Sequence, residues 1–137
     1  METNQICASV VDASLRVHRE LGPGLLESVY DVVLAHLLAE QGLSVERQKP
    51  IPIRVFGKSF DEGFRADLIV NECVLVELTS VERLARVHHK QVLSYLRLAD
   101  LKVGLLIDFG GELLKGNIER IVVGEAPDLR KGASTRE

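Results

Sequence analysis

The sequence is poor in cysteine, in aromatic side chains and in long apolar runs: it has two cysteines, no tryptophan and an aromatic content of 4%. Cys7 and Cys73 are too few and too far apart for a disulfide framework or a zinc site, so we predict that both are buried, reduced thiols. No apolar run approaches the ~20 residues that cross a bilayer. The first residues also lack the basic and apolar segments of a signal peptide. We therefore expect a cytoplasmic protein that does not enter a membrane.

The sequence also lacks an excess of basic residues. Its 137 residues include 20 acidic and 17 basic side chains, which gives a formal net charge of −3. A protein that coats nucleic acid without specificity needs many basic contacts to phosphate, so that class is excluded. A small basic face on an acidic body remains compatible with this charge. The length and the 46% hydrophobic content are typical of one folded domain.

Two helices are predicted at the start of the chain. Apolar residues recur at helical spacing over residues 6–21 and again over residues 25–41. The segment between them is Gly-Pro-Gly at positions 22–24, and both residue types end helices. The second helix is expected to turn five apolar residues toward the core: Leu25, Val29, Val32, Val33 and Leu37.

The rest of the chain alternates between strands and one further helix. Pro50 and Pro52 place the first strand at a sheet edge, because proline cannot donate to a neighbouring strand. The order ααβββαββ predicts an α/β fold with a central mixed sheet flanked by helices, in one domain over residues 1–123 with a flexible tail over 124–137. Strands are predicted over residues 43–55, 60–70, 73–78, 102–109 and 118–123, and the helix over 82–99.

Asp67 and Glu77 are acids inside otherwise apolar strands. A three-residue loop over 71–73 would place them directly opposite each other on one face, whereas a two-residue turn would place them on opposite faces. Two carboxylates that close repel each other unless a cation lies between them, and Mg²⁺ or Mn²⁺ prefers such oxygen ligands. The alternative is a pair of unrelated acids at the exposed end of the sheet.

Three further residues belong to the neighbourhood of this pair. Glu27 lies in the first turn of the second helix, where an acid also complements the helix dipole. Thr79 follows Glu77 by two residues and so projects to the same side, with a hydroxyl that can position a water but carries no charge. In the three-residue-loop register Arg65 lies opposite Thr79, where it could supply a cation.

Positive charge is concentrated on the predicted third helix. Residues 82–97 include four lysine or arginine side chains and one acid, and a solvated basic face is the ordinary explanation of such a run. The functional alternative is contact with the phosphates of a nucleic acid. Four side chains are candidates for that contact: Arg65, Arg83, Arg86 and Lys90.

Several ordered motifs resemble one known family. Residues 24–30, GLLESVY, fit the pattern GxxExxY, and the chain is similar to the GxxExxY proteins, a branch of the PD-(D/E)XK nuclease superfamily. The resemblance covers about residues 6–123 and implies a restriction-endonuclease-like core. Further matching segments are DEGFRAD at 61–67, VEL at 76–78, VERL at 81–84, HHKQ at 88–91, SYLR at 94–97 and GLLIDFG at 104–110.

The resemblance implies a set of catalytic residues. In that superfamily a strand acid and the acid of an ExK strand bind the metal, and these correspond to Asp67 and Glu77. A helix glutamate that often completes the metal shell corresponds to Glu27. Gln91 and Tyr95 resemble the QxxxY motif, which lies beside the active site of RecB-type nucleases.

The resemblance thus implies a nuclease that uses Mg²⁺ or Mn²⁺ to hydrolyse phosphodiester bonds in DNA or RNA. The sequence departs from the family at Thr79, which occupies the position of the ExK lysine. Either Lys90 or Arg65 takes the place of that lysine, or the protein is a catalytically inactive module that binds nucleic acid or a protein partner. A third alternative is a structural protein that assembles into homo-oligomers.

Overall fold

The computed structural model describes residues 1–124, so the predicted tail lies outside the described residues from position 125 onward. Within them the helices and strands follow the predicted order ααβββαββ. Helices α1 and α2 span Thr3–Leu21 and Glu27–Glu40, and α3 spans Arg86–Ala99. The strands are β1 (Val45–Val55), β2 (Lys58–Val70), β3 (Val74–Thr79), β4 (Val103–Asp108) and β5 (Ile118–Val122).

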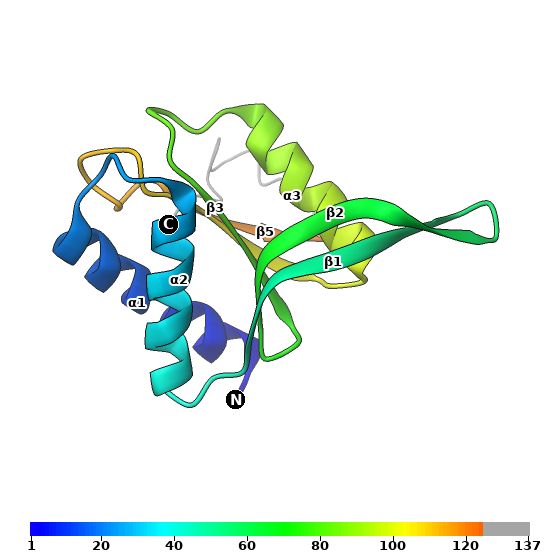
Figure 1. The fold of residues 1–137 in the computed structure, drawn as a ribbon, viewed down its shortest axis with the longest axis horizontal. Helices are drawn as coiled ribbons and strands as arrows, with labels where there is room; N and C mark the ends of the chain where they lie inside the picture. The colour runs from blue at the N-terminus through cyan, green and yellow to red at the C-terminus, as the bar shows by residue number, and fades with distance from the viewer. Residues whose placement is uncertain (125–137) are drawn as a thin grey trace.

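The five strands form one mixed sheet in the order β1-β2-β3-β4-β5. Only β3 and β4 run parallel, and α3 makes the crossover that a parallel pair requires. Helices α1 and α2 lie on one face of the sheet, and α3 lies on the other (Figure 1). The predicted α/β architecture with a central mixed sheet is therefore confirmed.

Each face of the sheet has its own core of apolar side chains. On the α1–α2 face the buried residues include Val10 and Leu34 from the helices and Leu68 from the sheet. On the α3 face, Val92 and Leu96 of the helix form a core with strand residues such as Leu75 and Leu106. Strand β3 contributes apolar side chains to both cores, so it is covered on two sides.

The predicted core stripe of the second helix is right for Val33 and Leu37, which are half-buried against the core, and wrong for Leu25, Val29 and Val32. Val29 and Val32 are exposed, and the residues that α2 buries in the core are Tyr30, Leu34, Ala35 and Leu38. Because α2 is apolar on most of its circumference, the periodicity of its sequence does not select one face. The third helix also differs from its prediction, since it begins at Arg86 and leaves Val87 exposed.

Strands β1 and β2 form a long hairpin whose tip extends beyond the rest of the fold (Figure 1). Strand β1 is at the sheet edge, as its two prolines predicted. The pairing register shifts between Ile51 and Ile53, so the outer part of the hairpin is offset from the part that joins the sheet. None of the helices within residues 1–124 is both long and apolar enough to cross a membrane.

Candidate active site

The β2–β3 connection decides the relation between Asp67 and Glu77. Val70 pairs with Val74, so the loop has three residues, and Asn71 and Glu72 in it both adopt positive φ. This is the register that places the two acids on one face. The backbone N–H of Asp67 donates to Glu77 Oε1 at 3.4 Å, and the N–H of Leu78 donates to Asp67 Oδ2 at 2.8 Å. Each carboxyl group therefore accepts a hydrogen bond from the backbone of the opposite strand, which keeps the two groups close together.

Glu77 lies in an environment that is unfavourable for negative charge. The pKa of Glu77 is raised to about 9, first by burial, then by the charge of Asp67 and a hydrogen bond with its side chain, and also by the charge of Glu27. Within residues 1–124 no lysine, arginine or histidine forms an ion pair with either acid. A cation bound at this site would therefore stabilise the charged form of Glu77.

A cavity of about 240 Å³ opens beside the pair, between β2, β3, α2 and α3. It gathers residues that are more than sixty positions apart in the sequence. The predicted site residues Glu27, Asp67, Glu77, Gln91 and Tyr95 all line it, and Arg65, Thr79 and His88 line it with them.

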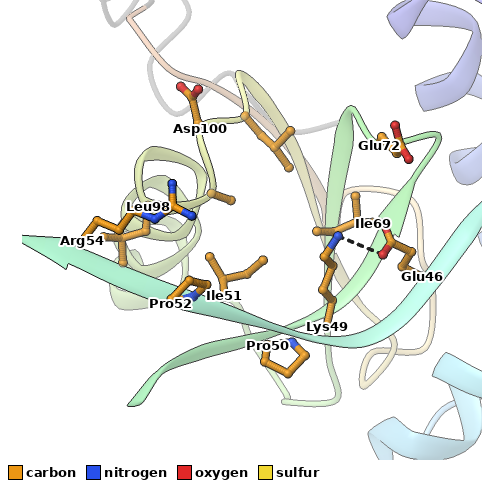
Figure 2. Close-up of a pocket in the computed structure, with 12 residues that line it drawn as sticks. Glu46, Lys49, Pro50, Ile51, Pro52, Arg54, Ile69, Glu72, Leu98 and Asp100 are labelled. Atoms are coloured by element: carbon orange, nitrogen blue, oxygen red, sulfur yellow. Dashed lines mark ion pairs between the residues drawn. The ribbon is translucent and has the colours of Figure 1, made fainter. Parts of the chain in front are cut away.

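A larger cavity, of about 330 Å³, lies where β1 passes the C-terminal end of α3 (Figure 2). Its floor is formed by proline and aliphatic side chains such as Pro50, Ile51 and Leu98. Lys49 neutralises Glu46 there, with the two charged groups 2.8 Å apart. The smaller cavity holds Asp67 and Glu77, and neither acid forms an ion pair within residues 1–124, so this cavity is the candidate active site.

The GxxExxY segment positions Glu27 through its glycine and its tyrosine. Gly24 adopts φ +95°, a conformation that side chains disfavour, in the turn between α1 and α2. The buried Tyr30 hydroxyl donates to the carbonyl of Gly22 at 2.5 Å and accepts from the N–H of Leu25 at 3.2 Å. The motif thus fixes the start of α2, and Glu27, the first residue of that helix, lines the cavity.

Gln91 and Tyr95 lie on the face of α3 above the acids. The side-chain amide of Gln91 donates to the Tyr95 hydroxyl at 2.7 Å, and the Tyr95 ring stacks on Phe64 with centroids 3.8 Å apart. Burial and the charge of Glu77 raise the pKa of Tyr95. The phenol therefore stays protonated and can donate a hydrogen bond into the cavity.

The predicted phosphate contacts divide into two groups. Arg65 lines the cavity, and so does Thr79. Arg83, Arg86 and Lys90 are exposed outside the cavity, and Arg83 precedes the helix instead of lying on it. These three exposed cations therefore lie on the outer surface of α3 and on the loop before it.

Sequence reasoning missed two residues that support Asp67. Gln48, in β1, donates to Asp67 Oδ1 at 3.5 Å and to Asp31 Oδ2. Asp31 is buried in α2 and accepts from Arg47 Nε at 2.8 Å. The only sequence signal was an acid one residue after Tyr30 in an apolar helix, because nothing in the sequence indicates that Gln48 adopts φ +50° inside a strand.

The sequence model of a protein family described as the PD-(D/E)XK nuclease superfamily matches residues 4–121. The chain belongs to this superfamily. No curated protein and no solved structure gives a significant match. The superfamily match includes the helices and strands described in residues 1–124 except Thr3 and Val122, so Asp67 and Glu77 of this PD-(D/E)XK domain lie within the matched region.

PD-(D/E)XK nucleases usually use divalent metal ions, and the donor set of this member fits such an ion. Asp67 and Glu77 have hard carboxylate oxygens that form no ion pair within residues 1–124, and Mg²⁺ is commonly bound through one or two carboxylates with water completing the shell. Among residues 1–124 no three His, Cys, Asp or Glu side chains converge closely enough to form a complete metal shell. Glu27 therefore lines the site without joining the close pair.

Proposed function

We propose that the protein is a metal-dependent nuclease of the GxxExxY branch, which hydrolyses phosphodiester bonds in DNA or RNA with Mg²⁺ or Mn²⁺. One observation carries the proposal: two carboxyl groups, one with its pKa raised to about 9, lie together at a cavity, and neither forms an ion pair within residues 1–124. Membership of the PD-(D/E)XK superfamily supports the same conclusion. The Gln91–Tyr95 pair beside the acids favours the RecB-like branch with its QxxxY motif.

In this proposal each cavity residue has a defined task. Asp67 and Glu77 hold the ion, and the hydrogen bond from the Leu78 N–H keeps Asp67 oriented. An ion held by these two residues would activate a water and would stabilise charge on the phosphate. Glu27 orients water on the open side of the cavity, and Tyr95 donates a hydrogen bond toward the substrate. Arg65 supplies positive charge near the phosphate.

Thr79 favours a second candidate function. It occupies the position of the ExK lysine and is buried, so its hydroxyl brings no charge to the acid pair. A member of the superfamily that has lost this lysine can retain the cavity for binding alone. The second candidate is therefore a catalytically inactive module that binds nucleic acid or a protein partner through the same surface.

Cleavage of labelled DNA and RNA, single-stranded and duplex, in the presence of Mg²⁺ or Mn²⁺ separates these functions. We expect cleavage by the wild type that Glu77→Gln abolishes. The matched control is Glu72→Gln, which removes an acid of the same β2–β3 hairpin outside the cavity and should cleave like the wild type. Calorimetry of metal binding accompanies the assay, and binding of metal and oligonucleotide without cleavage would favour the inactive module.

Restoring the lysine tests how the site manages without it. Thr79→Lys places an ammonium group in the cavity, and we expect cleavage to rise by at least ten-fold because general acid–base groups contribute about 10²–10⁴. Thr79→Met, similar in length and uncharged, should give no such increase. Arg65→Met should lower wild-type cleavage, whereas Lys90→Met should not, because of these two cations only Arg65 lines the cavity. The reverse order would assign the compensating charge to Lys90.

A further inference from the structure

The outer end of the β1–β2 hairpin has a side chain that folding does not explain. Val55 pairs with Lys58, so Phe56 and Gly57 form a two-residue turn, with φ +53° and +71°. Such turns favour asparagine or glycine at both positions, and a bulky residue with positive φ is an outlier. Phe56 is also 95% exposed. It therefore carries both a conformational cost and a hydration cost without any compensating contact.

The apolar character of the tip extends to its neighbours. Val55 and Phe60 are each about two-fifths exposed, at 39% and 43%. Together with Phe56 they give the arm an apolar end that projects away from both cores of the protein (Figure 1). Exposed clusters of apolar side chains are typical of surfaces that contact another molecule, so the tip is a candidate for such a contact.

The charge around the tip favours a polyanion as that molecule. Residues 54–60 contain Arg54 and Lys58 and no acid, although the whole chain has a formal charge of −3. Both cations are exposed, and the nearest acids begin at Asp61 on the strand below the tip. Arg54 extends along the rim of the larger cavity toward α3 (Figure 2). An exposed aromatic ring between cations is the arrangement that stacks on bases while contacting phosphates.

The arm also has the reach to contact what the active site holds. Asp67 and the tip are connected by the single strand β2, and Lys58 lies nine residues from Asp67 along it. At about 3.3 Å per residue this separation is at most ~30 Å. One turn of duplex spans about 34 Å, so a nucleic acid in the cavity can extend to the tip.

We propose that the β1–β2 hairpin is a nucleic-acid-binding arm in which Phe56 stacks on a base and Lys58 and Arg54 contact neighbouring phosphates. The inference rests on the proposed function, since it takes its partner to be the substrate of the site. It adds to that function a second point of attachment, about one helical turn away. The arm sets how the substrate lies relative to the acids.

Fluorescence anisotropy with labelled 30-nucleotide DNA and RNA, in single strands and duplexes, tests the arm, with Ca²⁺ present because it takes the same oxygen ligands. Phe56→Asn removes the ring and suits the turn, so its melting temperature should equal or exceed that of the wild type. We expect its Kd to be at least ten-fold weaker, as loss of one stacked base implies, with an unchanged dependence on salt. Lys58→Ser should instead reduce the salt slope by about one.

The control is Leu113→Asn, which replaces another strongly exposed apolar side chain, in the β4–β5 connection, and should bind like the wild type. Quenching of 2-aminopurine in the bound strand, lost in Phe56→Asn, would support stacking. Equal binding by Phe56→Asn and wild type overturns the arm, while metal-dependent cleavage by the wild type would leave the proposed nuclease intact. Absence of all binding overturns the arm, and the cleavage assay then judges the nuclease separately. If the wild type is a dimer and Phe56→Asn is a monomer, the proposed nucleic-acid-binding arm is also overturned. The tip would then contact a second copy of this chain.

Discussion

At the scale of single residues, the raised pKa of Glu77 is the main electrostatic feature of the cavity. Its carboxyl group is buried beside another acid, so the folded protein holds a proton that the unfolded chain would release at neutral pH. A divalent cation can replace that proton. Binding of the ion therefore releases a proton, and the affinity for metal should increase as the pH rises toward 9.

Without metal, the raised pKa predicts a specific dependence of stability on pH. Because the pKa is about 9 in the folded state and near 4.5 in the unfolded state, the contribution of Glu77 to the free energy of unfolding is greatest below pH 4.5 and is lost between pH 4.5 and 9. Glu77→Gln removes this loss. Its stability relative to the wild type should rise with pH by up to about 1.4 kcal/mol per unit.

Urea unfolding at pH 5, 7 and 9 in the presence of EDTA measures this difference. Glu72→Gln should follow the wild type at every pH. A constant difference between Glu77→Gln and wild type would contradict the assigned protonation of Glu77.

From the sequence, the relation between Asp67 and Glu77 was limited to two alternatives because the side chains of a pleated strand alternate between its two faces. Once the loop has three residues, both acids must project to one face. The same reasoning could not find Gln48, whose amide reaches Asp67 only because its backbone adopts φ +50° within β1. A left-handed residue in a strand results from packing between distant elements, which no local pattern records.

At the scale of elements, the turn between α1 and α2 and the face of α3 use their tyrosines differently. Tyr30→Phe should lower the free energy of unfolding by about 1–2 kcal/mol, because the buried hydroxyl bonds Gly22 and Leu25 while the ring can still stack on Phe109. Tyr95→Phe should leave stability nearly unchanged and reduce cleavage. Urea unfolding and cleavage rates of both variants check this separation, and equal effects of the two on stability would sink it.

The contact between α2 and β1 positions the site through Asp31. Asp31→Asn replaces the carboxylate oxygen that accepts from the Gln48 amide by an NH₂ group, so two donors face each other. We expect a loss of about 1–3 kcal/mol in stability, and weaker metal binding because Gln48 also contacts Asp67. Arg47→Gln removes the ion pair with Asp31 but leaves Gln48 in place, and it should bind metal like the wild type. Calorimetry and urea unfolding distinguish the two. Equal metal affinity in all three proteins would assign Asp31 to stability alone.

The elements themselves were predictable where a pattern had one solution. Strand β3 is apolar except at Glu77 and Thr79, and α1 has a clear apolar stripe, so both follow from the sequence. Helix α2 is apolar nearly all round, and its orientation depends on the Tyr30 hydroxyl and on Asp31, which meet partners from other segments. Pairwise contacts of this kind decide the rotation of a helix that its own periodicity leaves open.

At the scale of the whole molecule, an ion between Asp67 and Glu77 should stabilise the fold. It would bind the native state and not the unfolded chain, so Mg²⁺ or Mn²⁺ at one hundred times its Kd should add about 2.7 kcal/mol. Thermal unfolding should show the wild-type melting temperature rising by several degrees on addition of metal. The Asp67→Asn, Glu77→Gln double variant should show no rise. An equal rise in both proteins would move the ion to another site.

The two prolines of the edge strand have a consequence for how the molecule meets others. Pro50 and Pro52 remove two amide donors from β1, which forms one edge of the sheet. A foreign strand therefore cannot extend the sheet there by regular pairing, which protects the chain against edge-to-edge aggregation. Whatever approaches this side of the protein must be recognised through side chains, and the projecting arm offers its aromatic tip in place of its backbone.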